Sequence, residues 1–270
     1  VGEGAGLARY DIQTGDFVSA LTGQVALPYT TNPVGWDKNN DDFGPFDPAV
    51  YTPHGTVITA EERTNGRLFE WLNPLMAAGD TANVVWRSNI PAVSHEGLKF
   101  DASGTLYFID ESNTGSIYKF VPKTAGDLSV GQSFVLKVTA FTGIASENWD
   151  SATNTGKTRT GAATWVAITD ANGVKTTTAN PFDFSSATTG GRAAADEVGG
   201  TPYGRPEDLE IIGDTLYVAT TSENAVYGIN LKTNEVKLFA SRSTIDGGTA
   251  LAAGINLNNP DNLASDAAGN

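Results

Sequence analysis

The stretches "HGTVITAEERTNGRLFEW" (54–71) and "SGTLYFIDESNTGSIYKF" (103–120) align without a gap, and this repetition decides the fold class. Each combines a strand rich in β-branched and aromatic residues, a polar turn containing Asn and Gly, and a second strand. This is the pattern of a β-hairpin. A third copy, "GDTLYVATTSENAVYGIN" (213–230), is one residue shorter before its second strand. A hairpin that recurs along one chain predicts an all-β protein built from similar units.

Two other segments extend the same pattern. "GLARYDIQTGDFV" (6–18) and "AVYGINLKTNEVKLF" (225–239) both show a strand, a turn and a strand. The sequence contains no convincing long amphipathic helix, and we expect at most one short helical turn at 73–82. The Thr-, Ala- and Gly-rich region 139–200 is typical of long loops or an insertion.

A second motif precedes the hairpins. An acid, a small or polar residue and a Leu recur in "SHEGLKFDASG" (94–104), "RPEDLEIIGD" (205–214) and "NPDNLASDAAG" (259–269). The acids are Glu96, Glu207 and Asp261, and their spacings of 207 − 96 = 111 and 261 − 207 = 54 are close to two to one. A period near 54 residues fits a β-propeller blade of four short strands. We therefore predict a single β-propeller domain over residues 1–270, with the acid-x-Leu motifs on its innermost strands.

The third copy of this motif stops at Asn270, where a strand follows in the two earlier copies. A propeller must close on itself, because an open blade leaves strand edges and core exposed. We therefore expect the native chain to be longer, with terminal segments missing from this sequence.

The composition excludes several classes of function. The chain carries 31 acidic and 17 basic residues, a formal charge of −14. This charge argues against nucleic acid or an anionic membrane as a partner and is compatible with bound cations. The sequence has no cysteine, which excludes disulfides, thiolate metal sites and cysteine nucleophiles. No apolar run reaches the length of a membrane span.

The recurring acids predict a metal site. The residue ahead of an innermost propeller strand lies at the channel mouth, so Glu96, Glu207 and Asp261 are expected to converge from different blades. Converging carboxylates repel one another, and they either take up protons or bind cations. Oxygen ligands in a flexible ring suit calcium. The alternative is that each acid caps a turn by accepting backbone N–H bonds.

Five more side chains are candidates for the same region. Glu62 and Glu111 are equivalent in the hairpin alignment, and either form an outer shell around the axis or only solubilise the hairpins. His95 is either a structural histidine or a contact to metal or phosphate. Arg63 and Arg205 each stand beside a motif acid, and they either neutralise that neighbour or face an anionic substrate.

The segments "TVITAEER", "SHEGLKFDASGTLYFIDE", "GRPEDLEI" and "NNPDNLASDAAGN" resemble the PhoX-type alkaline phosphatases and their uncharacterised propeller relatives. The resemblance covers roughly residues 6–270, and its "RPED" and "PDNL" pieces are the most specific. It implies a six-bladed, secreted or periplasmic propeller with a calcium- and iron-containing axial cluster that hydrolyses phosphomonoesters. By motif position, the metal-binding carboxylates fall on Glu96, Glu207 and Asp261, with Glu61 or Glu62 nearby.

One position departs from the family pattern. The resemblance places an iron-binding cysteine directly before the Glu61-Glu62 pair, where this sequence has Ala60. An alanine cannot form the iron–thiolate bond, so iron and the phosphatase activity are less well supported than calcium.

Three functions follow from these observations. The first is a metal-dependent phosphomonoesterase that acts on a small phosphate ester or another small molecule. The second is a non-catalytic, calcium-stabilised extracellular propeller with a binding or structural role. The third is a calcium-dependent lactonase-type hydrolase. In each case we expect the protein to be secreted, periplasmic or on the cell surface.

Overall fold

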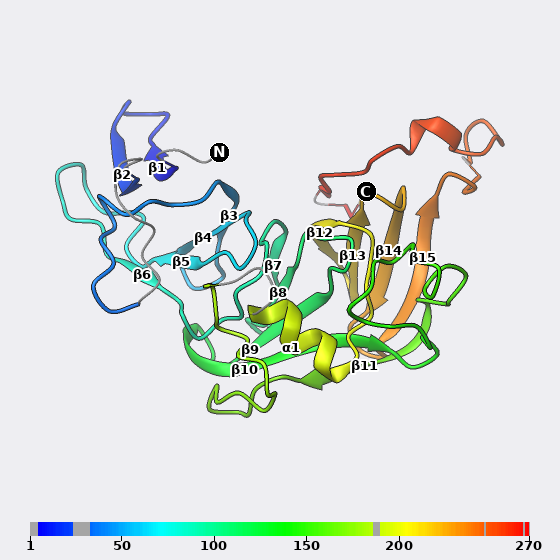
Figure 1. The fold of residues 1–270 in the computed structure, drawn as a ribbon. Coiled ribbons are helices and arrows are strands. Elements are labelled where there is room, and N and C mark those ends of the chain that lie inside the picture. Colours follow the sequence, from blue (N-terminus) through cyan, green and yellow to red (C-terminus); the bar gives the residue numbers. More distant parts are fainter. Residues whose placement is uncertain (1–4, 24–32, 186–189, 246, 267, 270) are drawn as a thin grey trace.

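The computed structural model describes residues 5–23, 33–185, 190–245, 247–266 and 268–269. Within these residues the chain forms fifteen strands, one α-helix and one 3-10 helix (Figure 1). The prediction of an all-β protein is confirmed. No helix in this described part of the chain is long and apolar enough to cross a membrane.

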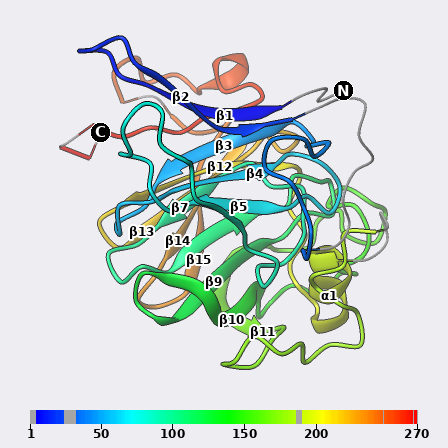
Figure 2. The ribbon, with the colours of Figure 1, turned by 90° about the vertical axis from the view of Figure 1, so that its left-hand side faces the viewer.

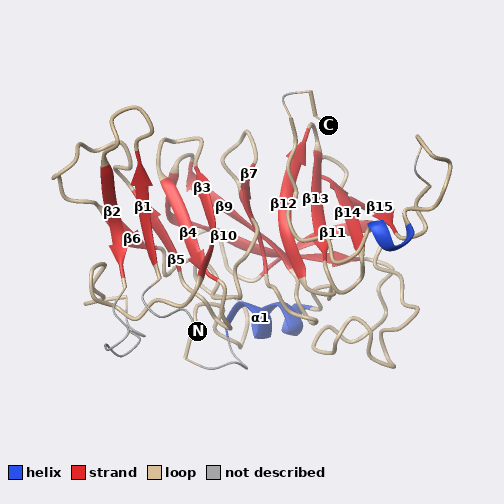
Figure 3. Ribbon diagram, turned by 90° about the horizontal axis from the view of Figure 1, so that it is seen from above, coloured by secondary structure: helices blue, strands red, loops and turns tan. Residues whose placement is uncertain are grey.

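Three four-stranded antiparallel meanders follow one another along the chain (Figures 1 and 3). The first consists of β3 (Phe46–Tyr51), β4 (Val57–Glu61), β5 (Leu68–Trp71) and β6 (Val84–Trp86). The second consists of β7 (Leu98–Phe100), β8 (Leu106–Ile109), β9 (Ile117–Thr124) and β10 (Asp127–Val138). The third consists of β12 (Pro206–Ile212), β13 (Thr215–Thr220), β14 (Ala225–Asn230) and β15 (Glu235–Ser241). The first strands of the three meanders lie together, because β7 contacts both β3 and β12.

The remaining elements join or cover the meanders. β11 (Gly161–Ala167) pairs with both β10 and β15, so the second and third meanders belong to one nine-stranded sheet. β1 (Gly6–Tyr10) and β2 (Phe17–Thr22) form a separate hairpin. This hairpin lies against the first meander (Figure 2), where Leu21 of β2 shares an apolar cluster with Phe69 and Trp71.

The structure contains the hairpins that the sequence predicts. The aligned stretches 54–71, 103–120 and 213–230 form the pairs β4–β5, β8–β9 and β13–β14. The stretches 6–18 and 225–239 form β1–β2 and β14–β15. At the first turn Asn65 has φ +57°, a left-handed conformation that asparagine adopts more readily than most residues.

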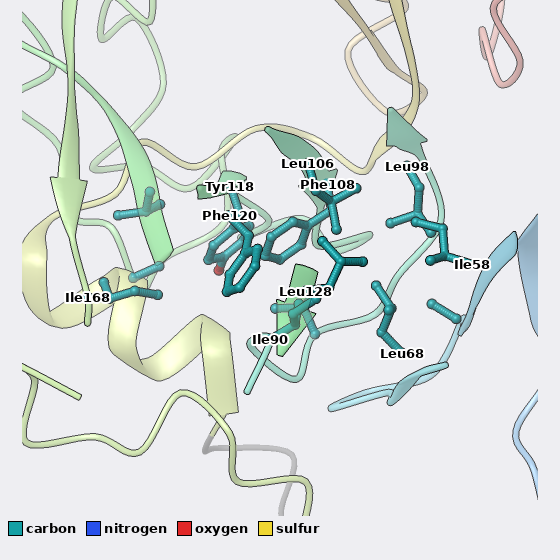
Figure 4. Packing of buried hydrophobic residues seen from close by; sticks show 14 of the residues in the cluster. Ile58, Leu68, Ile90, Leu98, Leu106, Phe108, Tyr118, Phe120, Leu128 and Ile168 are labelled. Carbon is teal, nitrogen blue, oxygen red and sulfur yellow. The ribbon is translucent and has the colours of Figure 1, made fainter. Parts of the chain in front are cut away.

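An apolar cluster joins the first two meanders (Figure 4). Ile58 and Leu68 of the first meander face Leu98 of the second, and all three are at most 3% exposed. Burying one such side chain stabilises the fold by about 1.5–3 kcal/mol. The strands β4, β5 and β8 are buried along almost their whole length, which holds their ends, and the acids there, in fixed positions.

Two expectations differ from the structure. The region 139–200, expected to be loops or an insertion, contains β11 and also α1 (Gly190–Val198). The sequence does not indicate this helix, because it has only nine residues and begins with two glycines, which are poor helix formers. Burial of Ala194 and Ala195 against the rest of the protein stabilises it. Leu263 lies outside any strand, so the third acid-x-Leu motif does not open a strand as the first two do. Six blades, a single domain over 1–270 and a longer native chain stay predictions.

Candidate metal centre

Glu96, Glu207 and Asp261 come together where β7 meets β12. Glu96 stands two residues ahead of β7, and Glu207 is the second residue of β12. Asp261 lies in the segment after the 3-10 helix η1 (Gly254–Asn256). One carboxylate oxygen from each of the three lies within 4.8 Å of the other two. The structure thus brings the three predicted acids to one point, while their binding of a metal stays a prediction.

Backbone contacts fix this convergence. The Gly97 amide donates to the carbonyl of Glu207 at 2.9 Å, which ties the two first strands together. A Cβ at Gly97 would lie 2.6 Å from that carbonyl oxygen, so no side chain fits there. Asp208 accepts the Leu263 amide at 2.8 Å and thereby holds the segment that carries Asp261. Pro260 in the same segment accepts a bond of 2.7 Å from the Thr221 hydroxyl.

Glu207 is not a turn cap. It is 1% exposed, no backbone amide of the described residues donates to its carboxylate, and its polar neighbours are the carboxyl group of Glu96 and the hydroxyl of Thr221. Nη2 of Arg205 lies 3.2 Å from Oε1 and forms an ion pair without hydrogen-bond geometry. Turn capping, the alternative derived from the sequence, is the role of the neighbouring Asp208, which accepts two backbone amides.

Burial and neighbouring carboxylates raise the pKa values of Glu96, Glu207 and Glu62. Burial, and then the Glu207 carboxylate, raise the pKa of Glu96 far above its ordinary value. Burial raises the pKa of Glu207 as well. Burial and the neighbouring Glu111 carboxylate raise the pKa of Glu62 to about 7. Carboxyl groups in such a cluster hold protons until a cation replaces them.

Arg205 supplies positive charge at the edge of the cluster. Its Nε donates to Oε1 of Glu111 at 2.9 Å, and its Nη2 donates to the same oxygen. The guanidinium is also the ion-pair partner of Glu207, yet the Arg205 side chain is 43% exposed. It can therefore meet an anion from solvent while it touches the buried carboxylates.

Asp47, on β3, belongs to this region and was missed in the sequence. Its charge raises the pKa of both Glu62 and Glu96. Asp47, Glu96 and Asp208 line one pocket of about 200 Å³. The signal was present, because Asp47 precedes Gly55 by 55 − 47 = 8 residues and Glu96 precedes Gly104 by 104 − 96 = 8. It was overlooked because Ala49 replaces the Leu of the motif.

Glu61 is held by strong hydrogen bonds within the first meander. Its Oε1 accepts bonds of 2.8 Å from the Gly44 amide and from Nη2 of Arg67, and its Oε2 accepts the Arg67 amide and Nε. The pair is fully buried. Asp110, the aligned acid, is held in the same way by Arg192. Both Glu61 oxygens thus already accept strong bonds, and metal binding by Glu61 or Glu62 stays a prediction.

The last two candidate residues, His95 and Arg63, are sequence neighbours of Glu96 and Glu62. His95 is fully buried, its ring lies 5.4 Å from that of Phe108, and burial lowers its pKa to about 4, so it stays neutral at pH 7. The side chain of Arg63 packs against Gly44. The alternatives given for His95 and Arg63 in the sequence therefore both stay open.

Comparison with known proteins adds one finding. A family model described as alkaline phosphatase PhoX matches residues 80–270. The matched range includes Glu96, Arg205, Glu207 and Asp261. No curated protein sequence matches the chain significantly.

Proposed function

Because the chain belongs to the alkaline phosphatase PhoX family, we propose that it hydrolyses small phosphate monoesters at a metal ion held by Glu96, Glu207 and Asp261. The observation that carries the proposal is Glu207. Its carboxylate is 1% exposed beside Glu96 and Asp261, and it shares its one ion-pair partner in the described part of the chain, Arg205, with Glu111, so a bound cation would lower the cost of burying these charges together.

The donor set fits a hard divalent cation. Three carboxylates supply oxygen ligands of the kind that calcium and magnesium prefer, and calcium tolerates the irregular geometry of side chains from separate elements. Calcium takes six to eight oxygens, so positions remain for water and for substrate oxygens. Asp47 acts electrostatically on Glu96, and Glu62 lies close enough to Glu207 to feel its charge, so both would strengthen cation binding when they are ionised.

Iron fits less well. Ala60, at the position where the family resemblance places an iron-binding cysteine, is fully buried in the apolar cluster with Ile58 and Leu68. Its methyl group offers no ligand atom. We therefore propose calcium as the resident ion.

In this proposal each residue has a distinct task. A bound divalent cation supplies Lewis-acid polarisation of the phosphoryl group and lowers the pKa of water. Arg205 binds the phosphate oxygens from the solvent side, where its planar guanidinium can donate two parallel hydrogen bonds. Glu62, with a pKa near 7, can hold or release a proton close to the reacting group at neutral pH. Glu111 orients Arg205 by accepting from its Nε and Nη2.

Measurement of bound metal and of phosphatase activity on one sample tests the proposal. We expect the purified protein to contain calcium, and to release phosphate from a simple aryl phosphate when calcium is present. A protein that binds no divalent cation contradicts the metal site, and one that binds calcium without activity contradicts the phosphatase assignment.

Ala60 favours a second candidate function. Because this chain has no cysteine thiolate at position 60, the same carboxylates would support a calcium-stabilised propeller with a binding or structural role. Calcium binding that raises thermal stability, with no phosphate release under any metal supply, would support this candidate. The lactonase alternative has no observation in its favour. Under either function we propose, from the family resemblance, a secreted, periplasmic or cell-surface location.

A further inference from the structure

Arg205 reaches the carboxylate cluster from an unusual backbone conformation. Its φ of +48° lies in the left-handed region, which non-glycine residues seldom adopt. Its amide donates to the carbonyl of Ser112 at 3.0 Å, and its carbonyl accepts the Thr221 amide at 3.0 Å. Such a conformation persists only where the surrounding structure enforces it.

Glu223 holds the residue before Arg205. It lies in the turn between β13 and β14, and its side chain is 4% exposed. Its Oε1 accepts the Gly204 amide at 2.7 Å. Its Oε2 accepts the hydroxyl of Tyr227 at 2.7 Å and also Nη2 of Arg159. The carboxylate therefore connects the Arg205 turn to two donors outside the metal centre.

The packing around Gly204 is equally restrictive. A Cβ there would lie 2.5 Å from Nε1 of Trp149 and 2.7 Å from Cγ of Glu223, so only glycine fits. The Arg159 guanidinium stacks over the Trp149 ring at 5.3 Å. We call these four side chains around Gly204 the Glu223 clamp: Trp149, Arg159, Glu223 and Tyr227.

We propose that Glu223 is a positioning residue for phosphate recognition, acting through Gly204 on Arg205. The clamp fixes the turn, and the turn aims the guanidinium at the space beside Glu111 and Glu207. The ligand class is the dianionic phosphoryl group of a monoester, whose oxygens match the guanidinium donors. The phosphate role rests on the proposed function, whereas the control of Arg205 by Glu223 does not.

A spectroscopic test addresses Arg205 directly. The Nε–Hε resonance of Arg205 is identified in a ¹⁵N-correlated NMR spectrum of the whole protein by its loss in Arg205→Lys. In Glu223→Gln, an amide NH₂ replaces an oxygen that accepts from Arg159 and Tyr227, so the clamp must rearrange. We expect the Arg205 resonance to shift, because the turn that aims the guanidinium relaxes. Its Hε should exchange with water about tenfold faster, as expected when its charge-assisted hydrogen bond to Glu111 is weakened.

Glu70→Gln is the matched control. Glu70 is also a buried glutamate, with a side chain 3% exposed, and it accepts from Nε of Arg87 at 2.6 Å on the first meander. It should lower the melting temperature similarly and leave the Arg205 resonance unchanged. If Glu223→Gln does not fold, Tyr227→Phe decides, because it removes one donor to Glu223 and keeps the ring. An Arg205 signal that stays unchanged in the folded Glu223 variant, or in Tyr227→Phe where that is the variant used, overturns the proposal.

Inorganic phosphate distinguishes this inference from the proposed function. With calcium present, we expect Glu223→Gln to weaken phosphate binding about tenfold in the wild-type background and to have no further effect in Arg205→Lys. Equal effects in both backgrounds mean that Glu223 does not act through Arg205, and they overturn the inference. If the wild type binds no phosphate but Glu223→Gln still loosens the Arg205 resonance, the positioning of Arg205 stands and the proposed function fails.

Discussion

Glu207→Gln should stabilise the calcium-free protein and destabilise the calcium-loaded protein, each compared with the wild type in the same state. Without a cation, the variant removes one charge from three carboxylates that lie within 4.8 Å of one another. Two unit charges at that distance repel by about 3 kcal/mol at an effective dielectric constant of about 20. Raised pKa values already relieve part of this repulsion by protonation. We therefore expect the calcium-free variant to be more stable than calcium-free wild type by about 1 kcal/mol.

With calcium present, the order should change. A ligand at 100 times its dissociation constant stabilises the folded state by about 2.7 kcal/mol. A Gln at position 207 removes a charged ligand from the ion, and we expect it to weaken calcium binding by about 100-fold, which abolishes most of that gain. The calcium-loaded wild type should therefore be the most stable of the four samples.

Thermal unfolding followed by circular dichroism measures this directly, in a chelator and in excess calcium. For a chain of this size, 1 kcal/mol corresponds to about 2–4 °C, so calcium should raise the wild-type melting temperature by about 5–10 °C and that of Glu207→Gln by about 2 °C or less. Glu70→Gln, a buried glutamate outside the cluster, should retain the full calcium shift. Equal calcium shifts in the wild type and Glu207→Gln would refute the reasoning.

Three more predictions follow from the same contacts. Burial and Glu111 raise the pKa of Glu62 from 4.5 to about 7 in the folded state. The calcium-free fold is therefore most stable with respect to this group below pH 4.5, and it loses stability as the pH rises to 7 and Glu62 ionises. Melting temperatures between pH 5 and 8 should therefore fall less steeply for Glu62→Gln than for the wild type, and parallel slopes would argue against a shifted Glu62. Arg67→Met leaves Asp41 and Glu61 buried without this cation, so chemical denaturation should show a loss of about 3–5 kcal/mol with no change in calcium affinity; an altered calcium affinity would indicate that Glu61 contributes to the metal site. Ala60→Cys should increase bound iron in metal analysis if the rest of an iron site is intact, and an unchanged iron content would show that this chain has diverged beyond its phosphatase relatives.

The sequence was informative where one motif recurs. The recurrence of the motif at Glu96, Glu207 and Asp261 predicted a convergence that the structure contains, although Asp261 reaches it from a segment outside the three meanders. The hairpins were equally readable, since their turns use Asn and Gly between β-branched strands. The rest depends on contacts that repetition does not encode.

Glu61 illustrates this limit. Alignment places Glu61 on Asp110, yet the first binds Arg67 in its own hairpin and the second binds Arg192 on α1. No local pattern distinguishes an acid that faces an arginine from one that faces a metal. Asp47 was hidden by one substitution in the motif, and Glu223 acts on Arg205 through tertiary contacts that become visible only in the folded chain.

The most direct test of the account is phosphate release from an aryl phosphate monoester by protein that has been stripped with a chelator and then reloaded with calcium. We predict that chelation abolishes hydrolysis by the wild type, that calcium restores it, and that calcium does not restore it in Glu207→Gln. Hydrolysis that survives chelation, or that Glu207→Gln performs as well as the wild type, would contradict a catalytic metal at Glu96, Glu207 and Asp261. No hydrolysis by the calcium-loaded wild type would contradict the assignment as a calcium-dependent phosphatase.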